Sequence, residues 1–327
     1  SLSLSPPTPS SSSILFSFPP PFFFFFFSCS FLLPLFLAGK VANSIFGRSC
    51  VEPREPRRVR VLQGTIGRSG SSSLRLALTE LGFAPMHGSE VLSDPASVRA
   101  FVYKNASSML QIAEAAGFDI LMEIHAVLFE DLFALRPDAK VIAMERDFES
   151  QYRSWVFLIE TFFDPGTIGS SSRFPVSLLP PAANFNLMLP FQLAWASHDT
   201  SDCALGRSCP LNSPEHRACL RAALQDRADY LRAHVPAEQL LVFRLGVDGY
   251  PELCRFLDVP AERCPQQPFP RINNKTEMVN FSRLLATIEI VTRALLLLTL
   301  ILAAVGLATC CRRPTAKNTA TEKKKTR

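Results

Sequence analysis

Residues 59–74 read Val59-Arg-Val-Leu-Gln-Gly-Thr-Ile-Gly-Arg-Ser-Gly-Ser-Ser-Ser-Leu74, and they give the strongest indication of the fold class. β-Branched and apolar side chains over residues 59–63 predict a strand. Glycine and serine fill the turn that follows, and Ser71–Leu81 then carries leucines at helical spacing. A strand, a glycine-rich turn and a helix in this order are typical of a phosphate-binding site.

The turn contains the groups that bind an anion. Backbone N–H groups and the positive end of the helix dipole point into such a turn, and glycine lets the backbone approach a phosphate closely. Arg68 adds a planar guanidinium charge. An ordinary glycine- and serine-rich turn is the alternative interpretation. The candidate phosphate-binding residues are Gly67, Arg68, Ser69, Gly70, Ser71 and Ser72.

Two common classes of phosphate loop do not fit this turn. A nucleoside-triphosphatase loop requires G-x-x-x-x-G-K-[ST], whereas Gly64 and Gly70 lie one residue too far apart and Ser71 replaces the lysine. A dinucleotide-binding loop needs an acidic residue about twenty positions further on, at the end of a second strand, and we find no such residue there. ATP hydrolysis and dinucleotide binding are therefore disfavoured.

Strands and helices alternate along the rest of the domain, which predicts an α/β fold with a three-layer parallel sheet and helices on both faces. Residues 161–212 are rich in Pro, Ser and Phe with weak periodicity, and we interpret them as an insertion or lid. The predicted helices cover residues 97–116, 126–135, 149–160, 213–234 and 251–257, and the predicted strands cover 118–123, 140–145 and 240–244.

Residues 67–74 resemble the G-R-[ST]-G-[ST]-x-S-L loop of a subfamily of sulfotransferases. The resemblance implies the P-loop-NTPase-like fold of those enzymes and the sulfuryl donor 3′-phosphoadenosine 5′-phosphosulfate (PAPS). In that family the loop cradles the 5′-phosphosulfate group. Arg68 stands where many sulfotransferases have lysine, and arginine is common in this subfamily.

A second match lies further along the chain. Sulfotransferases hold the 3′-phosphate with an arginine after a central strand and a serine eight residues later. Here Arg146 follows the strand at 140–145, and Ser154 lies eight residues on. Residues 136–155 resemble the family's P-D-A-K-V-I…R-D-P…W-Y-x-S segment, with Phe148 replacing its second proline. A solvated arginine and an ordinary helix serine are the alternative.

A third match covers residues 240–273, which resemble the closing segment of the family. The resemblance implies that Arg271 either approaches the nucleotide or helps to fold the C-terminal turn.

The usual catalytic base is missing. Relatives carry Asp-x-Pro after the strand at 118–123, but this chain reads Leu121-Met-Glu-Ile-His125. The aspartate position falls on Met122 and the proline position on Ile124. Glu123 and His125 are the two candidate bases, and Arg68 is the candidate that stabilises the leaving phosphate. A third alternative is that neither base is catalytic.

These motifs predict a sulfotransferase that moves a sulfuryl group from PAPS to a hydroxyl or amine of a small-molecule or lipid-like acceptor. A catalytically impaired nucleotide-binding or scaffold protein of the same fold is the alternative. The nine cysteines form no C-x-x-C pair, so we predict no metal site. The basic residues gather in the C-terminal tail, which does not favour nucleic-acid binding.

A membrane anchor is predicted near the C-terminus. Residues 294–311 carry no charge, lie between arginines and would span about 27 Å as a helix. We expect residues 275–293 to be a juxtamembrane linker. The basic tail, 312–327, places the C-terminus in the cytosol by the positive-inside rule. Its Lys324-Lys325 pair resembles a dilysine retrieval signal, so we expect the endoplasmic reticulum or Golgi membrane.

The sulfotransferase-like domain is predicted over residues 58–274, after a low-complexity segment and linker at 1–57. Residues 1–37 are almost entirely Ser, Leu, Pro and Phe, as in a translated pyrimidine tract or a targeting segment. A luminal domain would need such a targeting segment, whereas a tail-anchored protein would have a cytosolic domain. Five cysteines could pair in a lumen: Cys203, Cys209, Cys219, Cys254 and Cys264.

Overall fold

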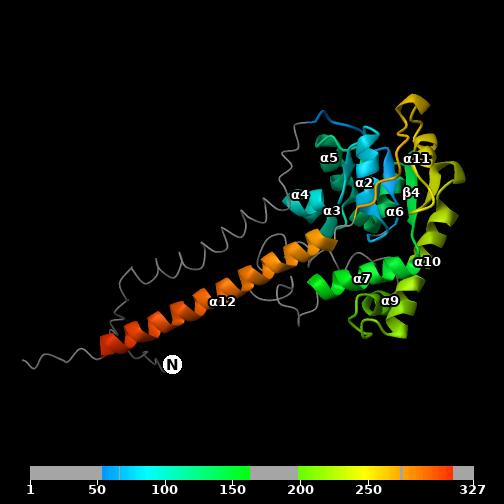
Figure 1. Ribbon diagram of the computed structural model, residues 1–327. Helices are drawn as coiled ribbons and strands as arrows, with labels where there is room; N and C mark the ends of the chain where they lie inside the picture. The colour runs from blue at the N-terminus through cyan, green and yellow to red at the C-terminus, as the bar shows by residue number, and fades with distance from the viewer. Residues whose placement is uncertain (1–53, 66, 163–197, 273–274, 312–327) are drawn as a thin grey trace, which may run out of the picture.

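The computed structural model describes residues 54–65, 67–162, 198–272 and 275–311, and Figure 1 shows their arrangement. Five parallel strands form one sheet in the order β2-β3-β1-β4-β5. This confirms the predicted α/β fold with a parallel sheet. The strands are β1 (Val61–Gln63), β2 (Pro85–Met86), β3 (Ile120–Leu121), β4 (Lys140–Glu145) and β5 (Leu240–Arg244).

Helices cover both faces of the sheet. Successive residues of a strand point to opposite faces, and in β1 Val61 packs in one apolar core while Leu62 packs in the other. The Val61 core is covered by α2 (Ser71–Glu80) and α11 (Tyr250–Phe256). The Leu62 core is covered by α4 (Pro95–Val102), α5 (Ala106–Ala115), α6 (Phe129–Leu135) and α10 (Pro214–His234).

The segment before β3 differs from the prediction in detail. The single helix predicted over 97–116 is two helices, because Lys104 has a φ of 51° and Asn105 caps α5 by accepting from the Ser108 N–H at 2.9 Å. Strand β2 and the short helix α3 (Gly88–Ser93) have no counterpart in the prediction. Elements of two and six residues are too short to show a hydrophobic period.

The stretch after β3 also differs. The strand predicted over 118–123 is only two residues long in the structure, and a 3₁₀ helix, η1 (Glu123–Leu128), replaces its end and the start of the predicted helix. Glu123 has a φ of 56°, which a strand does not allow. The contacts that Glu123 makes with Gln63, Ser71 and His87 therefore override the local apolar pattern.

A third apolar cluster joins α7 (Phe148–Phe162) and α9 (His198–Ala204) to α10. Trp155 of α7 is fully buried in it and donates from Nε1 to the Ala204 carbonyl oxygen at 2.7 Å. Helix α9 lies inside the stretch 161–212 that we interpreted as an insertion or lid, and its seven residues are too few to show a clear period. Residues 163–197 of that stretch lie outside the described residues.

Two disulfides join described cysteines, Cys203–Cys209 and Cys254–Cys264. The first closes the loop between α9 and α10, and the second ties α11 to the 3₁₀ helix η5 (Ala261–Arg263). A further 3₁₀ helix, η4 (Ala237–Gln239), precedes β5. Four of the five cysteines that we expected to be able to pair are thus paired.

The chain ends its described part in one long helix, α12 (Lys275–Cys311), which projects away from the domain in Figure 1. The predicted linker and the predicted span both fall within this continuous helix. By length and composition, Ser282–Val305 is apolar enough to cross a membrane, with a mean hydropathy of 2.3. Residues 1–53 and the basic tail lie outside the described residues.

Candidate functional site

Four segments that follow neighbouring strands meet at one edge of the sheet. The carboxyl ends of parallel strands lie on the same edge, where α/β proteins bind ligands. His87 follows β2, Glu123 follows β3, the loop Gly64–Gly70 follows β1, and Arg146 follows β4. The parallel topology therefore gathers the phosphate loop, a candidate base and the candidate 3′-phosphate arginine.

The phosphate loop has the backbone conformation that its glycines allow. Gly70 has a φ of 107°, and a Cβ atom there would lie 2.6 Å from Leu245 Cδ2. Arg68 also has a left-handed backbone, with a φ of 66°. Helix α2 starts at Ser71, so its unpaired N–H groups and the positive end of its dipole face this loop. The observed geometry suits an anion at this position.

The loop contacts the second predicted phosphate cluster directly. Arg68 Nε donates to Ser154 Oγ at 2.9 Å, and Arg146 Nη1 donates to the Arg68 carbonyl oxygen at 3.0 Å. No carboxylate of the described residues lies within 4.0 Å of either guanidinium. The structure thus brings together Arg68, Arg146 and Ser154, as the motif match requires.

Both guanidinium charges are destabilised by their surroundings. Burial lowers the pKa of Arg68 against the raising effect of the Glu123 charge, and burial lowers the pKa of Arg146 against that of Asp147. Burial disfavours a charged form unless an opposite charge compensates it. An anion bound between the two arginines would supply that compensation.

Glu123 is held in place by three groups. Its N–H donates to Gln63 Oε1 at 3.0 Å, Ser71 Oγ donates to its Oε1 at 3.3 Å, and His87 Nε2 lies 3.1 Å from its Oε2. A left-handed non-glycine residue is strained, and such strain gathers at functional sites. The carboxylate of Glu123 is therefore fixed beside the phosphate loop.

Two glycines make room for this carboxylate. A Cβ atom on Gly67 would lie 2.9 Å from Glu123 Oε1, and one on Gly88 would lie 2.7 Å from Oε2. Gly67 of the loop motif therefore leaves space for the Glu123 carboxylate.

His87 is a site residue that the sequence analysis missed. Its Nε2 lies 3.1 Å from Ser71 Oγ as well as beside Glu123. Its position after a two-residue strand gave no periodic signal. The only local signal is the turn-like sequence His87-Gly-Ser, which resembles many surface loops.

His125, the other candidate base, has a different environment. Its ring is buried, and its Nδ1 lies 2.6 Å from the Met122 carbonyl oxygen, so Nδ1 carries the proton. Its Nε2 has no hydrogen-bond partner among the described residues. Burial lowers the pKa of His125 to about 4. A buried imidazole of this kind is a weak base.

Arg271 lies in the closing segment, which returns to the phosphate loop. The N–H of Ile272 donates to Ser73 Oγ at 3.0 Å, and this bond places the segment at the first turn of α2. The Arg271 side chain is exposed. The structure therefore places Arg271 near α2, the helix that follows the phosphate loop.

A buried arginine on α10 positions two of the site loops. Arg227 donates from Nε to the Gly64 carbonyl oxygen at 2.7 Å, from Nη2 to the Ala126 carbonyl oxygen at 2.8 Å, and from Nη1 to Glu130 Oε1 at 2.6 Å. It thereby joins the start of the phosphate loop to the segment that follows Glu123. Nothing in the local sequence of α10 distinguishes Arg227 from its other arginines.

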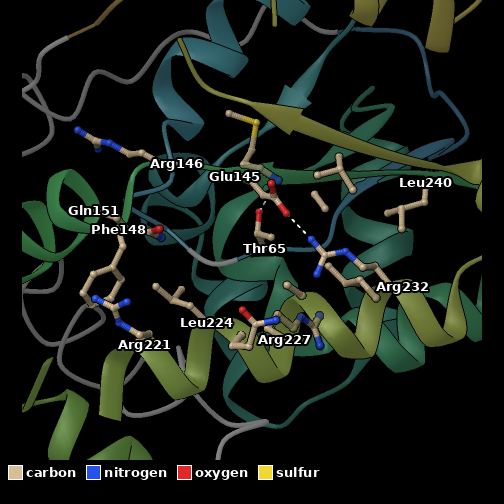
Figure 2. A pocket seen from close by; sticks show the side chains of 16 residues that line it. Thr65, Glu145, Arg146, Phe148, Gln151, Arg221, Leu224, Arg227, Arg232 and Leu240 are labelled. Carbon is tan, nitrogen blue, oxygen red and sulfur yellow. Dashed lines mark hydrogen bonds and ion pairs between the residues drawn. The ribbon is translucent and has the colours of Figure 1, made fainter. Parts of the chain in front are cut away.

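A cavity of about 380 Å³ adjoins the Arg146 side of the site and is shown in Figure 2. It lies between the β4 end, the start of α7 and α10, and its lining combines apolar and arginine side chains. Arg232 and Glu145 form an ion pair across it. Such a lining suits an organic anion. Its lining includes Thr65, Arg146, Phe148, Arg221, Leu224 and Leu231.

The family of the sulfotransferase domain matches residues 60–278, which is more than half of the chain. The match includes all five strands, the phosphate loop, Glu123, Arg146 and Ser154. No curated protein matches the sequence.

Proposed function

The chain belongs to the sulfotransferase domain family, and from that premise we propose that it transfers a sulfuryl group from PAPS to an acceptor hydroxyl or amine. The observation that carries the proposal is the direct contact of the phosphate loop with the Arg146 and Ser154 pair. These are the two clusters that would hold opposite ends of one nucleotide.

The residues present fit a donor with two separate phosphate groups. The loop amides, the start of α2 and Arg68 form one anion-binding region, and Arg146 with Ser154 forms the other. The two guanidiniums have no carboxylate partner among the described residues, and hydrogen bonds between a guanidinium and a phosphate are charge-assisted. In this assignment PAPS supplies the sulfuryl group when bound and retains its two phosphates afterwards.

Glu123 is our candidate for the base. Its fixed carboxylate lies beside the loop, so it can accept the proton of an acceptor hydroxyl as the new S–O bond forms. Arg68 and the loop amides stabilise the negative charge that develops on the leaving phosphate. His87 positions the carboxylate from the other side. We do not assign the base role to His125, because its ring is buried and its pKa is low.

Replacing Glu123 by Gln tests this function. We expect kcat for formation of 3′-phosphoadenosine 5′-phosphate (PAP) from PAPS, with a panel of phenols, amines and membrane lipids as acceptors, to fall about 100-fold or more. Binding of PAP, measured by calorimetry, should change less than about twofold, within what its error resolves. The control is Glu114→Gln, a carboxylate on α5 that is paired with Arg136 away from the site. Unchanged turnover in Glu123→Gln would exclude Glu123 as the base.

A catalytically impaired nucleotide-binding protein is the second candidate. The observation that favours it is the sequence Met122-Glu-Ile124 where relatives carry Asp-x-Pro. Both candidates require PAP to raise the melting temperature of the protein. Turnover by the wild-type chain then separates them, because the impaired protein would bind PAP without forming product.

We propose that the acceptor is a small molecule or lipid-like molecule reached at a membrane. The support is α12, which contacts α7, the helix that carries Ser154, and continues into an exposed apolar surface. Such a helix would hold the site close to the bilayer. The exposed apolar residues include Leu297, Leu298, Leu300, Ile301 and Leu302.

We further propose that the domain faces the lumen of the endoplasmic reticulum or Golgi. Two disulfides support this orientation, because disulfides persist in oxidising compartments. The basic tail would then lie in the cytosol. In sealed microsomes we expect the domain to resist added protease until detergent is present. Digestion without detergent would contradict the luminal orientation.

A further inference from the structure

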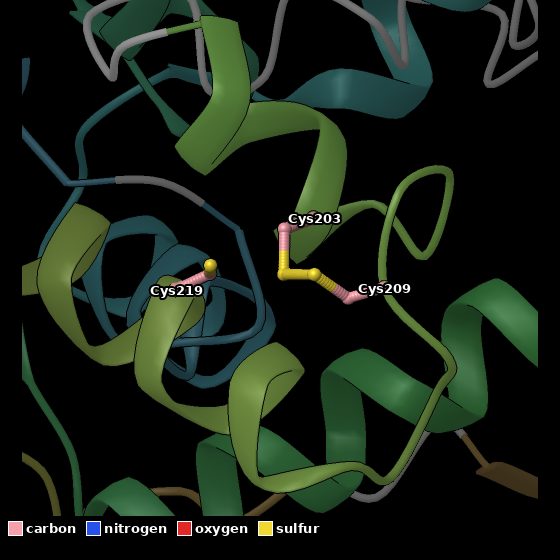
Figure 3. Close-up of side chains that lie close together, drawn as sticks. All are labelled: Cys203, Cys209 and Cys219. Atoms are coloured by element: carbon pink, nitrogen blue, oxygen red, sulfur yellow. A yellow bond between two sulfur atoms is a disulfide. The ribbon is translucent and has the colours of Figure 1, made fainter.

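Three cysteine sulfurs gather where α9 meets α10. Cys203 and Cys209 form a disulfide, and Cys219, on the second turn of α10, is a free thiol. The three Sγ atoms all lie within 4.8 Å of one another. In the view of Figure 3, the Cys219 sulfur lies on the Cys203 side of the disulfide. A thiol at this distance is a candidate nucleophile for the disulfide.

We propose that these three cysteines form a thiol–disulfide exchange site, in which the bond to Cys203 moves between Cys209 and Cys219. In the forward step the Cys219 thiol loses its proton and its sulfur bonds to Cys203 Sγ. The bond between Cys203 and Cys209 breaks, and Cys209 leaves as a thiolate that takes up a proton. One disulfide and one thiol exist before and after, so the step needs no oxidant or reductant.

The resting form keeps the Cys203–Cys209 bond closed. Burial raises the pKa of the Cys219 thiol, and the charge of Glu215 raises it further. The thiolate is the attacking species in exchange. Exchange is therefore slow in the resting protein and would speed up when the α9–α10 contact opens.

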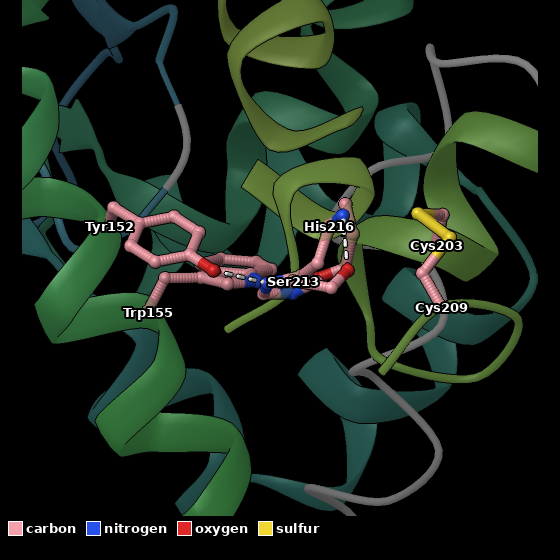
Figure 4. Close-up of a disulfide and its surroundings, with 7 residues drawn as sticks. Tyr152, Trp155, Cys203, Cys209, Ser213 and His216 are labelled. Carbon is pink, nitrogen blue, oxygen red and sulfur yellow. Dashed lines mark hydrogen bonds between the residues drawn. A yellow bond between two sulfur atoms is a disulfide. The ribbon is translucent and has the colours of Figure 1, made fainter. Parts of the chain in front are cut away.

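The loop closed by this disulfide is connected to α7, as Figure 4 shows. The Ala204 carbonyl oxygen, next to Cys203, accepts from Trp155 Nε1 at 2.7 Å and from His216 Nε2 at 3.0 Å. His216 Nδ1 in turn lies 2.8 Å from the Tyr152 hydroxyl. Tyr152 and Trp155 lie on either side of Ser154 on α7, and both pack in the apolar cluster that joins α7 and α9 to α10.

Exchange would change how this loop is held. A Cys203–Cys219 bond ties α9 directly to α10 and replaces the small ring closed by Cys203 and Cys209 with a larger ring that spans the whole loop between the two helices. Ser213, at the end of that loop, caps α10 by accepting from the His216 N–H at 3.1 Å. The state of the disulfide is thus coupled to the packing of α7, and through α7 to Ser154.

The second disulfide supplies a matched control. Cys254 and Cys264 are bonded to each other, and Cys219 is the one free cysteine among those whose side chains the structure describes. Removing one partner of that pair therefore leaves a thiol with no described exchange partner.

The test uses the full chain with Cys209→Ala, folded in a glutathione redox buffer and then treated with acid and an alkylating reagent. Digestion without reduction, followed by mass spectrometry, is expected to give a Cys203–Cys219 linked peptide in most of the protein. In the control Cys264→Ala, Cys254 is expected to carry the alkylating reagent or glutathione and no intramolecular link. Cys203 and Cys219 that both carry the alkylating reagent or glutathione in Cys209→Ala would overturn the exchange site.

A second measurement does not depend on how that variant folds. Wild-type protein held in the same buffer should contain a fraction with a Cys203–Cys219 link and an alkylated Cys209, and its complete absence would also overturn the proposal. Hydrogen exchange tests the coupling to α7. We expect the α7 amides around Ser154 to exchange about fivefold faster or more in Cys209→Ala than in Cys264→Ala. Equal rates would overturn the coupling.

Discussion

Arg68 and Ser154 are separated by 86 positions in the sequence and joined by a hydrogen bond of 2.9 Å from the arginine Nε to the serine Oγ. Arg68 lies in the loop after β1, and Ser154 lies on α7, which follows β4. Since β1 and β4 are paired in parallel, both residues belong to the same edge of the sheet. The contact joins the group expected at one phosphate of the donor to the group expected at the other.

Replacing Arg146 by Ala should weaken binding of PAP about tenfold to a hundredfold, because hydrogen bonds to charged groups contribute about 1.5–3 kcal/mol. Titration calorimetry measures this affinity. Adenosine 5′-phosphate, which lacks the 3′-phosphate, is the matched ligand, and its affinity should change little. A similar loss for both ligands would show that Arg146 does not recognise the 3′-phosphate.

Replacing Gly70 by Ala should destabilise the phosphate loop. Its φ of 107° is costly for any residue with a Cβ atom, and that atom would also meet Leu245 Cδ2 at 2.6 Å. We expect the free energy of unfolding, measured by urea denaturation, to fall by about 2–3 kcal/mol. Gly82→Ala is the control, because Gly82 has a φ of 86° but no atom within 4 Å of its Cβ position. Equal losses in the two variants would mean that Leu245 simply moves aside.

Replacing Arg227 by Ala should lower the free energy of unfolding by about 3 kcal/mol, because two buried carbonyl oxygens lose their donor. These are the oxygens of Gly64 and Ala126. The exposed Arg232, on the same helix, is the control, and Arg232→Ala should change stability by less than about 1 kcal/mol. Urea denaturation with both variants checks the difference. Equal effects would mean that Arg227 does not anchor the loops.

His125 should make the protein less stable in mild acid. Burial lowers its folded-state pKa to about 4, whereas the ordinary value is 6.5. The unfolded chain therefore takes up a proton first as the pH falls. The neutral ring contributes its full stability above pH 6.5, and this contribution is lost as the pH falls toward 4.

The shift corresponds to about 3 kcal/mol between pH 7 and pH 4. Urea denaturation of wild type and His125→Asn across this range measures it, and the variant should show the smaller loss of stability on acidification. His234→Asn is the control, because the His234 side chain is exposed. Parallel pH profiles for wild type and His125→Asn would contradict a buried neutral imidazole.

The parts of this protein that depend on local order along the chain could be predicted from its sequence. The Gly67–Leu74 motif between a strand and a helix predicted the phosphate loop, and alternating elements predicted the parallel sheet. Arg146 and Ser154 could be found because residues 136–155 resemble a sulfotransferase motif in which the arginine and the serine lie eight positions apart. The apolar run in α12 was visible because eighteen consecutive residues carry no charge.

Contacts between residues of distant segments could not be predicted in this way, because they arise from the packing of the folded chain. His87 follows a strand too short to show a period, and Arg227 resembles the other arginines of α10 until its buried contacts are seen. The environments of Glu123 and His125 also depend on the packed loops, since packing fixes the Glu123 backbone against Gln63 and buries the His125 ring. The three-sulfur cluster at Cys219 exists because two helices and a loop pack at one point. Spacing along a chain reports local geometry, whereas proximity, burial and charge compensation arise only when the sheet brings its strand ends together.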